Sequence, residues 1–454
     1  MKVWLGKIKE SKALAVWRRL QVRCESVWRR LCAWCEPHAF VLTMLGIFVW
    51  RFALDGIYLK IIAPLWGYAG FVADVQPLRY FVSLLALTVC VPFVAELNRR
   101  SEPSSILLTL LNYLYFVPLT SYWGCSDSDW RFFAVALPYW ALLLFWQFRL
   151  PMPVLKPLGQ KHTRKGVWLL TAFAVVLVLY VSGRYTGFRL TFDIINVYDI
   201  RAEASGYNLP TIISYALSMM TVVLTFLILY WLRERKYWMV AALCVVYLFY
   251  FSIAALKGVF FLLLLSLAAW IFYRFWMLRA LPWLLALTAI PAAAEYLILK
   301  EAMLVSLFYR RMMYDPIRLS DMYRCFFAER PLNLFRSGIM GKFSFDVVYS
   351  TDIAKLIGEF EGTGSSANNG LLGDLFANLP MVLGLVVLPL ILVICWRLLD
   401  MAANKMPQKV LLPFCVMFAN TFINTSWSTA LLSHGFLLTC VVLYFYPKEE
   451  GRLS

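Results

Sequence analysis

Long uncharged stretches, separated by short basic segments, run along most of the chain. Residues 222–231, 259–271 and 381–395 contain no charged side chain and lie within longer apolar windows. A window of about 20 such residues crosses the hydrocarbon core of a bilayer as an α-helix. A helix is required there because lipid offers no hydrogen-bond partner to the backbone. The pattern predicts an all-α polytopic membrane protein.

Twelve apolar segments follow from this pattern. Lys and Arg gather in the loops after the second, fourth, sixth, eighth and tenth of them. Because cytoplasmic loops carry the excess of cations, the chain is expected to cross the membrane twelve times with both termini in the cytoplasm. The segments are 39–58, 78–96, 104–122, 131–148, 166–183, 209–232, 237–256, 258–277, 280–299, 379–397, 409–426 and 430–446.

Two of the outer loops are long. They cover 184–208 and 300–378, and the second contains nine cations and nine acids. A loop of this length is typical of a folded, functional region, and its apolar stretches predict short helices packed on the membrane surface. The chain thus divides into an amphipathic interfacial helix (1–36), nine membrane helices with the first long loop (37–299), the large outer loop (300–378), three membrane helices (379–446) and a cytoplasmic tail (447–454).

Composition and charge fit a lipid environment. The chain is 62% hydrophobic and 15% charged, with a formal net charge of +17. On a soluble protein that charge would suggest nucleic acid, but the cations lie at predicted cytoplasmic helix ends and no recognition helix or zinc finger is present, so nucleic acid is excluded. The basic segment 1–36 is expected to lie on the inner leaflet, and a docking site for a cytoplasmic partner is the alternative.

Cysteine and histidine are scattered. The Cys32–Cys35 pair near His38 has a metal-like or redox-like spacing but no second cysteine pair. Neither a metal site nor a cofactor is therefore expected. Cys125 and Cys325 are the two cysteines predicted to lie outside, and a disulfide between them stays open.

The first group of candidate residues follows the fifth apolar segment. Arg184, Tyr185 and Arg189 lie just outside it, and Tyr198 and Arg201 come shortly after. Arg binds phosphate oxygens through paired hydrogen bonds, and aromatic faces suit sugar rings. The alternative is that these arginines anchor the helix and pair with nearby acids.

A second group of cations lies in the other outer connections. Lys257 stands in a tight hairpin that is nearly free of charge, where it either snorkels to the interface or faces the interior. Arg310, Arg311 and Arg318 have a loose helical spacing within the large loop. They form either a cationic face or surface pairs with neighbouring acids.

The last candidate segment is rich in glycine and small polar residues. It runs from 362 to 380 into a predicted membrane helix and contains Asn368, Asn369 and Asp374. Glycines let backbone N–H groups and amides approach a ligand closely. The alternative is a flexible linker that ends at a helix start.

Together these motifs resemble the Wzy-type polymerases, which join O-antigen or capsular repeat units in bacteria. The likeness rests on Ser-Gly-Arg-Tyr and Val-Tyr-x-x-Arg within 182–203, on Lys257-Gly258, and on Ser-x-Asn-x-Gly-x-x-Gly-Asp-x-x-Ala-Asn within 364–378. Leu379-Pro380 departs from the expected glycine-containing continuation.

The resemblance implies a fold related to metal-independent GT-C-type glycosyltransferases and O-antigen ligases, in the bacterial inner membrane with a periplasmic active face. The substrates would be undecaprenyl-pyrophosphate-linked oligosaccharides, and a chain-length regulator and a flippase would be partners. Arg184, Arg189, Arg201, Arg310 and Arg311 would stabilise the leaving pyrophosphate, helped by Lys257. Asn368 and Asn369 would orient sugar hydroxyls, and His434, Asp199 or Asp374 would be the general base. The rival functions are a flippase for the same lipid-linked sugars, an O-antigen ligase, and a non-enzymatic assembly protein.

Overall fold

Helices make up nearly all of the structure. The computed structural model describes residues 36–151, 160–191, 200, 202–204, 206–254, 257–273, 277–336, 346–403 and 406–446. Within these ranges the β-pairing is limited to an isolated bridge between Ala73 and Ser126. In the same ranges nine helices are long and apolar enough to cross a membrane, and a bent pair adds a tenth. The prediction of an all-α membrane protein with many spans is confirmed.

Five of the nine spans contain a break or a turn of wider π-helix. The uninterrupted spans are α3 (Pro77–Leu97), α6 (Trp130–Arg149), α11 (Tyr237–Ala254) and α19 (Met381–Ala403). The first span, Glu36–Ala69, includes η2 (Tyr58–Ile62), α2 (Ala63–Trp66) and η3 (Gly67–Ala69). The other four are Pro103–Cys125, with α4 (Pro103–Leu111), η4 (Asn112–Phe116) and α5 (Val117–Cys125); Thr163–Thr186, with α7 (Gln160–Val181) and η5 (Ser182–Thr186); Leu278–Leu299, with α13 (Met277–Leu287), α14 (Ala289–Ala294) and η6 (Glu295–Leu299); and Trp427–Tyr444, with α21 (Trp427–Leu431) and α22 (Phe436–Tyr444).

The remaining three predicted segments form bent or shorter helices. α9 (Thr211–Ser218) and α10 (Met220–Arg233) meet at an angle of 44°. α12 (Lys257–Phe272) and α20 (Gln408–Asn424) are both shorter than the usual span of about 20 residues. The number of twelve crossings therefore stays a prediction.

The span Pro103–Cys125 is the central helix of the bundle, and nearly all of it is buried. Its π-helical turn η4 lies just before Pro118, which has no N–H to continue the regular pattern. The indole of Trp50 donates to the carbonyl of Tyr113 at 3.1 Å, and that of Trp140 donates to the side chain of Asn112 at 2.7 Å. These bonds hold the first span and α6 against the central helix.

Arg51 and Asp55 form a buried ion pair one helical turn apart in the first span. The disulfide that stayed open for Cys125 and Cys325 is not formed in the structure, and both are free thiols. Cys125 is buried with its Sγ 3.5 Å from Asp55, whereas Cys325 is exposed. Gly124 leaves room for the side chain of Arg51 in the Arg51–Asp55 pair, because a Cβ at this position would lie 2.9 Å from the guanidinium.

Two described helices of the long segment 300–378 pack against the bundle, and the expectation that its helices lie on the membrane surface stays a prediction. η7 (Val305–Tyr314) continues into α15 (Asp315–Phe327), and both pack against η2, η4 or α5. The ring of Tyr309 lies 5.8 Å from that of Trp50, and its hydroxyl lies 2.7 Å from Thr288. Val305, Tyr309 and Met313 of η7 are buried in these contacts.

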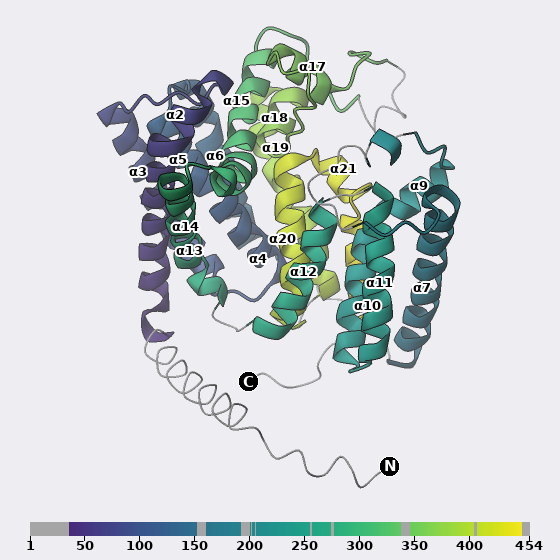
Figure 1. The fold of residues 1–454 in the computed structure, drawn as a ribbon. Coiled ribbons are helices and arrows are strands. Elements are labelled where there is room, and N and C mark those ends of the chain that lie inside the picture. Colours follow the sequence, from purple (N-terminus) through teal and green to yellow (C-terminus); the bar gives the residue numbers. More distant parts are fainter. Residues whose placement is uncertain are drawn as a thin grey trace.

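The bundle has two chemically different ends. α15 lies at one of them with α17 (Ile353–Phe360) and α18 (Leu372–Asn378), at the top of Figure 1, and we call this the α18 end. α6 begins there, because the ring of Phe132 lies 6.3 Å from that of Phe376 in α18. α6 ends at Arg149 after 20 residues, which is about 30 Å of helix. We call the second end the Arg149 end.

Candidate functional site

A polar cavity of about 460 Å³ lies at the α18 end. It is bounded by α9, α15, α17, α18, the segment 331–336 and the turn between α20 and α21. Its described lining contains amides, hydroxyls and carboxylates but no Lys or Arg. The polar lining residues are Tyr215, Tyr323, Asn333, Asp352, Asn368, Asn369, Asp374, Asn378, Thr425, Ser426, Ser428 and Thr429.

The start of α18 is fixed by a glycine pressed against the end of α20. A Cβ on Gly370 would lie 2.1 Å from the carbonyl oxygen of Phe422, so a larger residue would push the two segments apart. The N–H of Gly370 donates to the carbonyl of Ile423 at 3.0 Å. Leu371 follows with φ at 47°, a left-handed conformation that costs energy in a non-glycine residue. Tight packing therefore determines where α18 begins.

The end of α18 is bound to the segment 331–336. The side-chain oxygen of Asn378 accepts from the amide of Asn333 at 2.9 Å and from the N–H of Phe335 at 2.8 Å. Leu379 is then extended, as expected for a residue before proline, and α19 begins after Pro380. The Leu379-Pro380 departure from the motif thus makes α18 a separate short helix.

Asp374 is the buried carboxylate of the cavity, with 3% of its surface exposed. Its Oδ2 accepts from the N–H of Trp427 at 2.7 Å, and the hydroxyl of Ser426 also donates to it. Burial raises the pKa of Asp374 to about 7, and these two hydrogen bonds limit the rise. A carboxylate with this pKa exchanges its proton near neutral pH, as a general base must.

The two asparagines of the motif have different surroundings. Asn369 is buried, and its amide donates to the carbonyl of Pro316 at 2.7 Å while its oxygen accepts from Ser320 at 3.2 Å. It therefore ties the glycine-rich loop to α15. Asn368 is exposed and lines the cavity, so its amide faces the space that a ligand would occupy.

His434 lies beside the cavity. Its Nε2 is 3.4 Å from the hydroxyl of Thr425, a lining residue. The structure thus brings Asn368, Asn369 and Asp374 together in the cavity lining. His434 contacts the lining residue Thr425 but does not line the cavity itself.

Most arginines of η7 and α15 pair with acids or lie against aromatic rings, and Arg311 is the exception. Arg310 lies 3.4 Å from Asp315 and over the ring of Trp66. Arg318 pairs with Glu361. Arg311 is exposed. Pairing with neighbouring acids is the alternative that the sequence analysis left open for this group.

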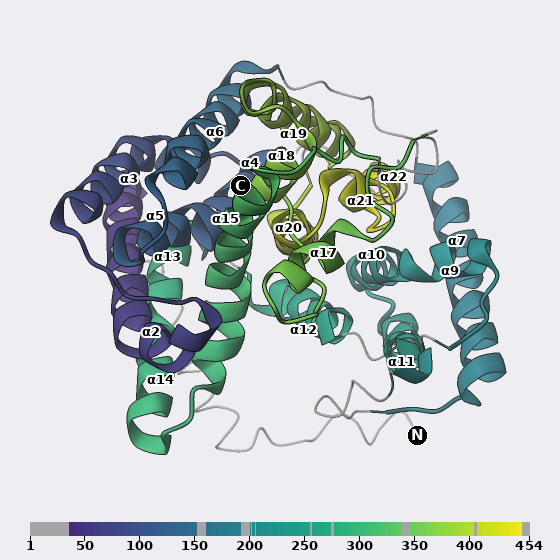
Figure 2. The same ribbon diagram turned by 90° about the horizontal axis from the view of Figure 1, so that it is seen from above.

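The arginines near η5 lie on a different side of the molecule. Arg189 pairs with Glu203 at 2.7 Å, and exposed Arg184 lies over the ring of Tyr185. η5 packs against α7 and α11, whereas η7 packs against α15 and α5. Figure 2 shows these two sets of helices at opposite sides of the bundle. If both arginine groups were to bind the same pyrophosphate, as the resemblance implies, they would have to meet; the structure does not bring their described members together.

Some candidates fall outside the described residues. These are Tyr198, Asp199 and Arg201, together with the segments 1–35 and 447–454. Lys257 opens α12, as the motif predicts, but its side chain is also outside the description.

The hydroxyl side chains that line the cavity were not predicted from the sequence. Thr425, Ser426, Ser428 and Thr429 line it, and they belong to a short polar run between two apolar segments. Such a run at a helix–helix connection was a usable signal. The contribution of Asn333 had no comparable signal, because it depends on how the segment 331–336 folds back onto α18.

Known proteins give no further guidance at this site. Comparison of the chain with protein-family models, with curated proteins and with solved structures finds no match.

Proposed function

We propose that this protein joins lipid-pyrophosphate-linked oligosaccharide repeat units at the periplasmic face of a bacterial inner membrane, in the manner of the Wzy-type polymerases that its motifs resemble. The observation that carries the proposal is Asp374, a buried carboxylate with a pKa near 7 in a cavity lined by amides and hydroxyls. Such a cavity suits the hydroxyl groups of a sugar, which both donate and accept hydrogen bonds.

The acceptor sugar occupies the cavity in this proposal. Asn368 and the hydroxyls of Thr425 and Ser428 orient it, and Asp374 accepts the proton of the attacking hydroxyl. The acceptor oxygen forms a bond to the anomeric carbon of the donor chain as the bond from that carbon to the pyrophosphate breaks. The bonding electrons leave with the lipid pyrophosphate. The new glycosidic bond therefore forms without a metal or a redox step.

The leaving pyrophosphate needs cations that the described lining lacks. Arg336 follows the lining residue Phe335 and lies 3.4 Å from Asp346, whose side chain is 86% exposed. So exposed a pair is weak and exchanges readily for a phosphate partner. We assign Arg336 to the leaving group, and the roles of Arg184, Arg310 and Arg311 stay predictions.

The rival functions differ in what they require. A flippase needs a polar path across the bilayer, whereas this cavity lies at one end of the bundle. An O-antigen ligase performs the same bond exchange with a different acceptor, so the reaction product separates it from a polymerase. A chain-length regulator is the partner expected for a polymerase.

The test is a gene deletion complemented with variants, with the surface polysaccharide resolved by length. A polymerase deletion leaves single capped repeat units, a ligase deletion leaves no polysaccharide on lipid A, and a flippase deletion traps units inside. Asp374→Asn should leave single units at normal protein level. Glu359→Gln, an exposed acid on α17 outside the cavity lining, should restore long chains. A normal length distribution with Asp374→Asn would refute the site.

A further inference from the structure

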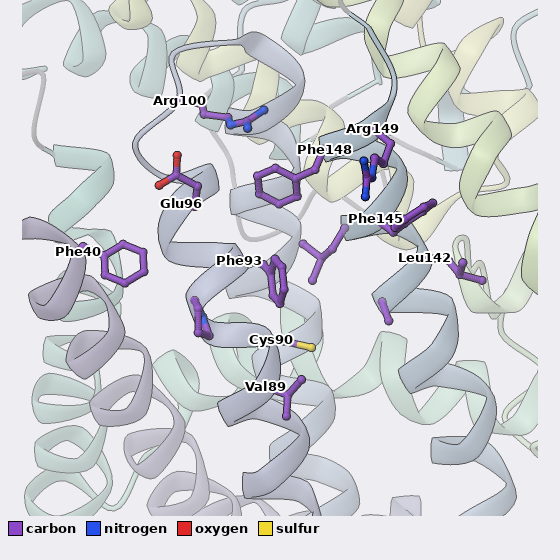
Figure 3. A pocket seen from close by; sticks show the side chains of 13 residues that line it. Phe40, Val89, Cys90, Phe93, Glu96, Arg100, Leu142, Phe145, Phe148 and Arg149 are labelled. Atoms are coloured by element: carbon purple, nitrogen blue, oxygen red, sulfur yellow. The ribbon is translucent and has the colours of Figure 1, made fainter.

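A second cavity, of about 950 Å³, lies at the Arg149 end between α3, α6 and the start of the first span. Figure 3 shows Arg100 and Arg149 at one end of it and Val89 and Cys90 at the other. This cavity is lined by the second half of α6, from Ala141 to Arg149, whereas α6 begins at the end where the polar cavity lies. Nothing proposed for the polar cavity depends on the second one.

The cavity exists because its two main walls pack against different neighbours. α3 packs mainly on α5, and α6 packs mainly on α19. Between α3 and α6 the rings of Phe93 and Phe148 meet at 6.1 Å. Phe93, Val89 and Phe145 are each about half exposed. The apolar part of the cavity thus opens sideways, where the lipid chains of the membrane lie.

The cations at the upper end of the cavity in Figure 3 are held against aromatic rings. The guanidinium of Arg100 lies 4.5 Å from the ring centre of Phe148, and that of Arg149 lies 5.7 Å from the ring centre of Phe145. Stacking fixes a guanidinium by its face and leaves N–H groups at its edge for an anion. Arg100 has a distant acid partner, Glu102, at 3.9 Å.

One acid also lines the cavity. Glu96 is paired with Arg99 at 3.2 Å, and both side chains are largely exposed. Glu102 lies 3.5 Å from Arg397 and accepts a hydrogen bond from Ser105. Glu96 is thus engaged by Arg99, and Glu102 is shared between Arg397 and Arg100. Arg149 has no acid partner in the described residues, so the field between Arg100 and Arg149 favours a negative ligand.

We infer that this cavity is a binding site for an anionic diacyl phospholipid. The phosphate lies between Arg100 and Arg149, and an acyl chain follows the apolar wall past Phe93 to Cys90. Two cations beside an exposed apolar cleft at a membrane boundary match a charged headgroup above hydrocarbon. The segment 1–35 of this chain is an unsuitable occupant, because its nine Lys and Arg would meet the two arginines with like charge.

The experiment uses the full chain in nanodiscs of phosphatidylglycerol or phosphatidylcholine, followed by native mass spectrometry of the released protein. The wild type should keep one phosphatidylglycerol and no phosphatidylcholine. The double variant Arg100→Gln/Arg149→Gln should keep phosphatidylglycerol about 30-fold less well. Lys165→Gln is the matched control, since Lys165 is an exposed cation that does not line the cavity, and it should retain the lipid.

A second variant tests the contribution of the apolar cleft independently of the two arginines. Ala141→Trp places a large ring against the cavity wall and keeps both arginines, and it should also release phosphatidylglycerol. Equal retention of both lipids, or unchanged retention in the double variant, would overturn the inference. So would displacement of phosphatidylglycerol by inorganic phosphate or by a polyprenyl phosphate at equal concentration. Polysaccharide length is not the readout, so failure here leaves the proposed polymerase activity standing.

Discussion

The two cavities of this protein are opposite in chemistry. The cavity at the α18 end is lined by amides, hydroxyls and the buried Asp374, and its described lining lacks cations. The cavity at the Arg149 end is lined by apolar and aromatic side chains with two arginines at its rim. The difference shows that net charge alone does not locate a site in a membrane protein. Burial of a single acid and stacking of two cations are more informative than the +17 of the whole chain.

The largest expected effect comes from breaking the polar cavity alone. Gly370→Ala places a Cβ 2.1 Å from a backbone oxygen of α20, so α18 must shift. We expect long polysaccharide chains to disappear and stability to fall by about 1–3 kcal/mol, measured by thermal unfolding in detergent. Gly166→Ala is the control, since a Cβ there meets open space. Phosphatidylglycerol retention should survive in both variants, and its loss in Gly370→Ala would mean that the two cavities are coupled.

A smaller effect is expected from the cation assigned to the leaving group. Arg336→Gln should slow chain extension about tenfold or more, because one donor to a developing charge is lost. Arg310→Gln serves as comparison, since Arg310 is already engaged by Asp315 and Trp66. Rates are measured in membranes supplied with lipid-linked repeat units. A stronger loss with Arg310→Gln would move the leaving-group site towards η7.

The pH dependence gives the next effect in size. Asp374 must be ionised to accept a proton, and its pKa is raised to about 7, so the rate should rise about tenfold from pH 6 to pH 8. Below about pH 4 the carboxyl is protonated in both folded and unfolded chains. Between about pH 4 and 7 only the folded chain keeps the proton, so stability should fall as pH rises through this range. Asp374→Asn should remove this contribution to the fall, and an identical pH-stability curve in the variant would contradict the assignment.

The smallest effect concerns an exposed pair. Arg189 and Glu203 meet at 2.7 Å with both side chains more than a third exposed, and solvent screens such a pair so that it contributes little to stability. Arg189→Gln should therefore change the unfolding temperature little. The length of the polysaccharide is the informative readout. Loss of long chains at unchanged protein stability would support the motif's prediction that Arg189 stabilises the leaving pyrophosphate.

The helices were predictable from the sequence because lipid imposes one requirement on every span. Each apolar window between 39 and 446 is mostly helical where the structure describes it, although some windows contain a turn, as at 432–435 in the last one. What the sequence could not provide was the packing of η7 against Trp50, since the charges of η7 resemble those of a surface helix. Tertiary contacts between segments far apart in sequence decided that placement.

The candidate site was predictable only in part, for a similar reason. Asn368, Asn369 and Asp374 share one short motif and were found together. Ser426, which donates to Asp374, and Asn333, which binds Asn378 at the end of α18, come from distant segments. Arg310 and Arg318, which looked available from sequence alone, are paired with acids. A motif identifies residues that lie close together in sequence, whereas the cavity depends on which distant segments pack around them.

The hydrogen bond from the Trp427 N–H to Asp374 joins two parts of the chain that belong to different helices. The proton affinity of the carboxylate and the position of the last helical hairpin are consequently linked, and linkage acts in both directions. Anything that draws the 425–429 turn away makes Asp374 a stronger base, and protonation of Asp374 weakens its hold on that turn. Through this one hydrogen bond, the protonation state of Asp374 and the position of the 425–429 segment are coupled.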